Sequence, residues 1–235
     1  MKRIRLMGLA LAAVFAFSAV VAASASTPEY IYKVEGAKLE AGKTEEASSV
    51  KAASIITLKG ETFGVKATAE CTKLKVPAGG EPLLVGGQPG TSSKGKLELS
   101  GCGAVVGGES CAEVKIAPIQ VNSEIVSVVS PAGKAGAAAT LLTPTGAAFT
   151  LVKFISCGNF GTVELEMEGN TAALNSVGEA KVGTERFSSG ANEITMVKTF
   201  AGTEKEVGLE FGGHRATLAG EAELQLKGVK KWGVA

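Results

Sequence analysis

Three glutamates at alternating positions, Glu164, Glu166 and Glu168, are the residues whose spacing best suits catalysis. If residues 162–168 form a β-strand, the three carboxylates lie on one face of the strand, at successive spacings of about 6.5 to 7 Å. Glycoside hydrolysis uses a pair of carboxylates on either side of the scissile bond. Glu164 and Glu168 are therefore candidate catalytic residues. The simpler interpretation is a solvated outer face of a half-buried strand, for which alternating glutamate is typical.

The same segment resembles the E-x-D-x-E strand of the laminarinase-type jelly-roll glycosidases, whose outer glutamates serve as nucleophile and acid/base. The resemblance covers only these residues, and Glu166 stands where that family has aspartate. The only tryptophan, Trp232, serves either as a sugar-stacking platform or as a cover for a sheet edge. A glycoside hydrolase and an extracellular carbohydrate-binding module therefore remain the alternative functions.

His214 is the only histidine, and it follows the turn Gly212-Gly213. As the general base of a serine hydrolase it needs a nucleophilic serine, but the sequence contains no G-x-S-x-G motif. A single histidine also excludes a multi-histidine metal site. Because the chain has no aspartate, EF-hand loops, β-roll calcium repeats and aspartic proteases are excluded as well. We predict no cofactor, no metal and no enzymatic activity.

The first 25 residues have the composition of a cleaved signal peptide. Three cations in Met1–Arg5 precede an apolar run, Leu6–Ala23, and the A-x-A cleavage motif Ala23–Ala25. A membrane anchor is the alternative, but the run is rich in alanine and near the lower length limit for a bilayer. No cysteine lies near the cleavage site to accept a lipid, and no second long apolar run follows. We expect a secreted or cell-surface protein with no membrane insertion after cleavage.

The charge balance of the mature chain bears on its partners. The chain has 24 cations and 23 anions, all of them glutamates, and the signal peptide removes Lys2, Arg3 and Arg5. The mature net charge is therefore about −2, whereas nucleic acids and anionic membranes require a basic surface. The expected partner is an extracellular or envelope component of unknown identity, with a glycan as one option.

Four cysteines in an exported chain indicate two disulfides, for which three pairings exist. Cys102 and Cys111 flank a short glycine-rich stretch whose ends are able to meet across a hairpin. We therefore predict Cys102 paired with Cys111 and Cys71 paired with Cys157. A zinc site is the alternative, but it lacks paired C-x-x-C spacing.

Period-two alternation of apolar and polar residues predicts an all-β protein, an antiparallel sandwich or barrel. Residues 149–157 are apolar at both odd and even positions, which predicts a central strand covered on each face. Residues 26–55 are of uncertain structure, with 36–53 as the best helix candidate, and 56–235 form a β-rich globular domain with a loop or boundary at 131–139. The alternation is clearest in segments 63–71, 96–100, 113–116, 162–168 and 221–227.

Short motifs distributed along the chain resemble those of a set of uncharacterised exported proteins of soil actinobacteria. The resemblance implies export and a disulfide-bonded β domain, and it carries no activity, ligand or catalytic residue. Together with the absence of an assembled catalytic constellation, it makes a secreted or cell-surface structural or interaction protein our leading hypothesis. The motifs are Met1–Ala10, Glu70-Cys71, Ser100–Cys102, Cys111, Ser156–Gly158, Met167–Asn170 and Lys231–Val234.

Overall fold

The structure is a computed structural model that describes residues 29–77, 79–80, 82–176, 178–187 and 193–235. The predicted signal peptide, residues 1–25, lies outside the described residues. Apart from two short 3-10 turns, η1 (Ala132–Lys134) and η2 (Gly158–Phe160), the regular structure of the described residues is β. The all-β prediction is therefore confirmed, and the helix candidate at 36–53 forms strands instead. No helix among the described residues is long and apolar enough to span a bilayer.

Fifteen strands join into one antiparallel hydrogen-bonded sheet. They are β3 (Thr44–Ala52), β4 (Ile56–Thr62), β5 (Val65–Lys75), β6 (Leu83–Val85), β7 (Thr91–Val106), β8 (Glu109–Ile116), β9 (Ile119–Ser130), β10 (Ala138–Pro144), β11 (Ala148–Cys157), β12 (Val163–Asn175), β13 (Val182–Phe187), β14 (Met196–Lys198), β15 (Glu204–Glu206), β16 (Gly208–Phe211) and β17 (His214–Leu226).

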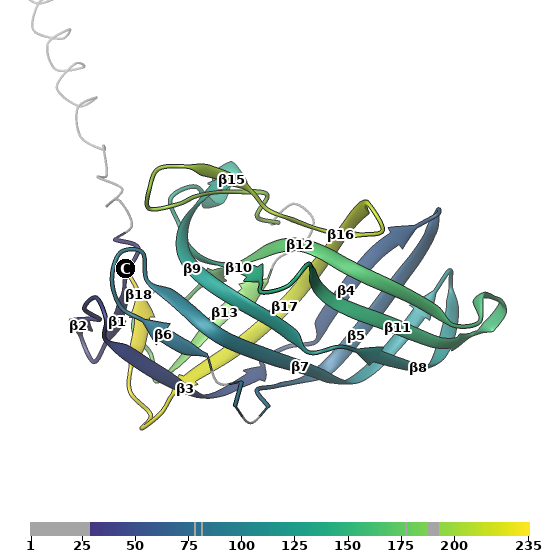
Figure 1. Cartoon of the computed structure of the whole chain (residues 1–235), viewed down its shortest axis with the longest axis horizontal. Helices are drawn as coiled ribbons and strands as arrows, with labels where there is room; N and C mark the ends of the chain where they lie inside the picture. Colours follow the sequence, from purple (N-terminus) through teal and green to yellow (C-terminus); the bar gives the residue numbers. More distant parts are fainter. Residues whose placement is uncertain (1–28, 78, 81, 177, 188–192) are drawn as a thin grey trace, which may run out of the picture.

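The sheet closes on itself, because the last long strand, β17, pairs with β3 and β4 at the start of the sheet. Several strands that follow one another in sequence occupy the same place in the wall, since they share a neighbour on one side and pair with two successive strands on the other. The result is an elongated up-and-down barrel, whose long strands run the length of the molecule in Figure 1. Its eight wall positions are β3/β4, β5/β6, β7, β8/β9, β10/β11, β12, β13/β16 and β17.

A small second sheet covers one end of the barrel. It contains β1 (Tyr32–Val34), β2 (Ala37–Lys38) and β18 (Trp232–Val234), in the order β18-β1-β2. Trp232 is 3% exposed, packs edge-on against Tyr32 and donates its indole N–H to the Leu224 carbonyl oxygen at 3.0 Å. Trp232 therefore covers the barrel end and offers no open face to a sugar.

The structure contains two disulfides, but the predicted pairing is wrong. Cys71 pairs with Cys102 across β5 and β7, and Cys111 pairs with Cys157 across β8 and β11. In each pair the two residues are direct cross-strand neighbours. The register of the β7–β8 hairpin explains the error. Its tight turn pairs Val106 with Glu109, and this register sets Cys111 opposite Ala104 rather than Cys102.

Part of the outer face of the barrel is covered by other residues, but not at the strand that the sequence pattern predicted. β11 alternates in burial, with Leu151 and Lys153 exposed, so residues 149–157 are not covered on both faces. Instead, residues 193–207, which include β14 and β15, cover the outside of β9, β10 and β12. Eight buried side chains form this outer cluster: Val126, Val128, Ala139, Leu141, Ala172, Ile194, Val197 and Val207.

Residues 131–139, predicted to be a loop or boundary, contain η1 and the turn that joins β9 to β10. These two strands pair directly with each other, in a register that runs from Ala138 opposite Ser127 to Pro144 opposite Val121. The connection is therefore part of the barrel wall.

Candidate functional site

The glutamates proposed as catalytic from the sequence lie on the outer surface of β12. The three glutamates of residues 164–168 are exposed, while Leu165 and Met167 point into the barrel. Glu164 forms an ion pair with Lys153 on the neighbouring strand, with its carboxylate 3.3 Å from the ammonium nitrogen. The structure therefore places these carboxylates on the kind of solvated strand face that the simpler interpretation describes.

A shallow groove of about 530 Å³ lies near one end of this row of glutamates. Glu168 lines it together with Glu206, Glu210 and Arg215, and Glu168 lies directly opposite Glu210 in the sheet. Neither Glu164 nor His214 lines the groove. His214 is exposed at the start of β17, so the structure does not bring the three sequence candidates into one site.

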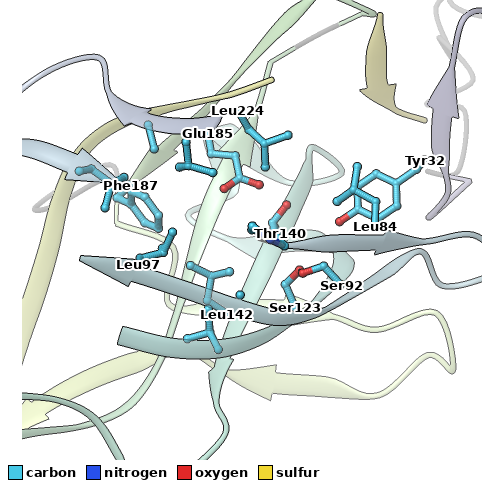
Figure 2. Close-up of a pocket in the computed structure, with 16 residues that line it drawn as sticks. Tyr32, Leu84, Ser92, Leu97, Ser123, Thr140, Leu142, Glu185, Phe187 and Leu224 are labelled. Atoms are coloured by element: carbon cyan, nitrogen blue, oxygen red, sulfur yellow. The ribbon is translucent and has the colours of Figure 1, made fainter. Parts of the chain in front are cut away.

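A cavity lies inside the barrel, behind the end covered by Tyr32. Its volume is about 50 Å³, which accommodates about three to five ordered waters or a molecule of similar size. Apolar residues make up most of the wall, among them the leucines and the phenylalanine labelled in Figure 2. The polar side chains that reach the cavity are Tyr32, Ser92, Ser123, Thr140 and Glu185.

The strand register explains why the cavity lies in this half of the barrel. The other half is filled by large inward side chains, among them Phe154, Met167 and Phe211, which are fully buried. Around the cavity, large inward side chains are interrupted by two small residues, Gly95 and Ala222. These two positions leave space among the large side chains.

Glu185 is the acidic residue of the cavity. It lies on β13 between Asn175 of β12 and Ala222 of β17, its direct cross-strand neighbours. Glu185 is half-buried and lines the cavity. Burial raises the pKa of its carboxyl group above the ordinary value, and the contact with the Thr140 hydroxyl offsets only part of this effect. The buried group therefore favours the neutral acid.

Thr140 connects Glu185 to a second polar side chain, Asn175, which lies on the same face of the sheet but does not line the cavity. Its hydroxyl donates to Asn175 Oδ1 at 2.9 Å, and the same hydroxyl lies within hydrogen-bonding reach of Glu185. Asn175 Nδ2 is buried and has no hydrogen-bond partner among the described residues. A buried donor without a partner is unfavourable, so this amide marks a place where an acceptor stabilises the protein.

Three hydroxyls form the other polar cluster of the cavity. Ser92 Oγ and Ser123 Oγ are 2.7 Å apart, and the Tyr32 hydroxyl lies near Ser123. Burial, with the charge of Glu185 as the second cause, raises the pKa of Tyr32 well above its ordinary value. Tyr32 is therefore a neutral donor at every physiological pH.

Sequence reasoning selected none of the residues that line this cavity as functional residues. The sequence did contain a signal for Glu185. Glu185 and Phe187 are two residues apart, so in a strand they lie on the same face, and a strand that buries Phe187 also turns Glu185 inward. The hydroxyl residues gave no comparable signal, since serine and threonine occur on both faces of strands.

Comparison of the chain with protein-family models, with curated proteins and with solved structures gives no significant match.

Proposed function

We propose that this protein is an exported, non-enzymatic binding protein that holds a small, mostly apolar molecule inside its barrel. The observation that carries the proposal is a largely apolar cavity inside the barrel into which a few polar side chains converge, a kind of lining that small-molecule sites have. Export is supported by the sequence of residues 1–25 and by two disulfides, which persist in oxidising compartments.

Binding accounts for the cavity better than catalysis does. Its titratable side chains are Glu185 and Tyr32, and both favour their neutral forms. The lining contains no histidine, cysteine or lysine to serve as a base or strong nucleophile beside them. Neutral hydroxyl and carboxyl groups are suited to orienting a ligand by hydrogen bonds rather than to transforming it.

Xenon is a suitable first probe, because it is apolar, small and independent of hydrogen bonding. We expect xenon to shift the methyl NMR signals of Leu84, Leu142 and Leu224 in the exported protein and to raise its thermal stability. Ala222→Leu fills the cavity and should abolish both effects. Ala219→Leu, on the same strand but in the opposite phase, is the matched control. Methyl signals that do not respond to xenon in the unaltered protein would refute the proposal.

The glycoside hydrolase alternative has one supporting observation, the position of Glu168 in the outer groove. Glu164, its predicted partner, is engaged with Lys153 outside that groove. Incubation with a β-glucan such as laminarin tests this alternative directly. Release of reducing sugar that is lost in both Glu164→Gln and Glu168→Gln would establish the hydrolase, and no release would remove it.

A further inference from the structure

The polar side chains of the cavity carry more protons than the described protein atoms accept. Tyr32, Ser92 and Ser123 bring three hydroxyl protons, the hydrogen bond between the two serines uses one, and the proximity of Tyr32 to Ser123 allows at most one more to be used. Whichever way these hydrogen bonds run, at least one hydroxyl proton is left without an acceptor. The presence of an unpaired hydroxyl proton therefore does not depend on how the hydroxyl groups are oriented.

The Glu185 side of the cavity has a surplus as well. With Thr140 donating to Asn175 Oδ1, the Thr140 oxygen is free to accept the proton of neutral Glu185, and the donor without an acceptor is Asn175 Nδ2, next to the cavity but not in its lining. If the amide is turned over, Nδ2 donates to Thr140 and Thr140 donates to Glu185. The acid proton of Glu185 is then the one without a partner.

Unpaired donors are less well tolerated in protein interiors than acceptors with a free lone pair. An oxygen atom that accepts hydrogen bonds therefore complements this cavity better than a donor does. The oxygen of an ordered water meets the same requirement, but water gains nothing from the apolar side chains that form most of the wall. An occupant with an oxygen atom and a short apolar body matches both parts of the lining.

A cation is a poorer match for this site. An ionised Glu185 would have to be stabilised by the ligand alone, because the charged side chains of the neighbouring strands face outward. Arg186 pairs with Glu221, and Lys51 pairs with Glu223, on the outer surface. On β9, Glu124 pairs with Lys205 in the same way. Burying an ion pair among apolar side chains costs desolvation on both partners.

We infer that the cavity binds a small neutral molecule that has a short apolar body and one hydrogen-bond-accepting oxygen, of which a short ketone is the simplest representative. The apolar body packs against Leu84, Leu97 and Leu142, and the oxygen accepts from Glu185 and the adjacent hydroxyls. This inference rests on the proposed function and adds the chemistry of the ligand to it.

Three probes of matched shape separate this inference from its rivals. They are butanone, 2-methylbut-1-ene, in which a methylene group replaces the ketone oxygen, and butan-2-amine, which is a cation at neutral pH. Each is titrated into the exported protein at pH 6, and methyl NMR shifts of the lining leucines give the dissociation constants. We expect butanone to bind about tenfold more tightly than the alkene, the ratio that one hydrogen bond to a buried group supports.

Substitutions at Glu185 test whether this residue donates the hydrogen bond to the ketone oxygen. Glu185→Gln keeps a donor in place and should retain the preference for butanone, whereas Glu185→Met keeps the length without a donor and should lose most of it. Glu223→Gln, which removes an outward carboxylate of the adjacent strand, is the control for charge alone. Butanone affinity should also fall as pH rises and Glu185 loses its proton, because a carboxylate no longer donates.

The outcomes distinguish the inference from the proposed function. If the alkene binds as tightly as butanone, the cavity is a purely apolar site and the inference is wrong, while the proposed function stands. If the amine binds most tightly, and more tightly as pH rises, the site is ionic and the inference is wrong. If no probe binds and xenon also fails, both proposals fall.

Discussion

Asn175 and Glu185 lie directly opposite each other on β12 and β13, and both side chains point into the barrel. Such a pair of polar residues on the inner face is costly unless each group is hydrogen-bonded. Thr140 contacts both of them and is itself buried, so the three residues form one polar unit in the cavity wall.

Replacing Glu185 by glutamine should change the pH dependence of stability. Native Glu185 retains its proton above the ordinary pKa of 4.5, whereas the unfolded chain releases it. The contribution of Glu185 to stability is thus fully present below pH 4.5 and is lost as pH rises through the pKa of the folded state. Urea unfolding between pH 4 and pH 8 should show a shallower decline for Glu185→Gln. Equal slopes for both proteins would contradict the raised pKa, and Glu223→Gln should match the unaltered protein.

The two disulfides should contribute similarly to stability. They join residues separated by 31 and 46 positions, for which the chain-entropy estimate is about 4 kcal/mol each. We expect the double variants Cys71→Ala/Cys102→Ala and Cys111→Ala/Cys157→Ala to lose comparable free energies of unfolding, measured in urea. Peptide mapping without reduction tests the pairing itself. A peptide that links Cys102 to Cys111 would show that the cross-strand register described here is wrong.

Phe63 should be replaceable with a gain in stability. It lies at the β4–β5 turn with φ of 49° and is 93% exposed, so it packs against little and occupies the left-handed region. Asparagine before Gly64 suits this turn, and Phe63→Asn should therefore stabilise the protein by about 0.5 to 1 kcal/mol. Phe63→Ala, which keeps the unfavourable φ, should show no such gain. A loss of stability in Phe63→Asn would instead reveal that the ring packs against something in the folded protein.

Gly183 should be intolerant of a side chain. A β-carbon at this position overlaps the indole ring of Trp232 in the covered end of the barrel. We expect Gly183→Ala to lower the free energy of unfolding by about 1 to 3 kcal/mol. Fluorescence reports this site specifically, because Trp232 is the only tryptophan. Gly103→Ala, where a β-carbon meets nothing within 4 Å, is the matched control.

The strands themselves were predictable from residue alternation. Leu165 and Met167 in β12, and Ala222, Leu224 and Leu226 in β17, are buried as their phase requires. The choice between sandwich and barrel was not predictable, because it depends on the pairing of β17 with β3 and β4. Apolar and polar residues alternate in the same way in a sandwich and in a barrel. Only the pairing of strands that are far apart in the sequence distinguishes the two architectures.

The site was less predictable than the fold. The outer cover of β9 was not predicted, because segment 125–129 is mostly apolar but nothing in it identifies residues 193–207 as the cover. The cavity depends on which inward positions are small, and the spatial relation between Ala222, Gly95 and Glu185 emerges only once the barrel closes. A catalytic pattern such as alternating glutamate is visible locally, whereas a cavity is a property of the whole wall.

Closure of the barrel by β17 has a consequence for how the chain matures. The hydrogen-bonding edges of β3 and β4 stay open until residues 214–226 arrive to pair with them, so every earlier stage of synthesis leaves unsatisfied strand edges. A chain that is exported before it folds reaches this last step outside the cytoplasm, where its cysteines also oxidise. Truncation ahead of β17 is thus expected to yield aggregates instead of a smaller soluble domain.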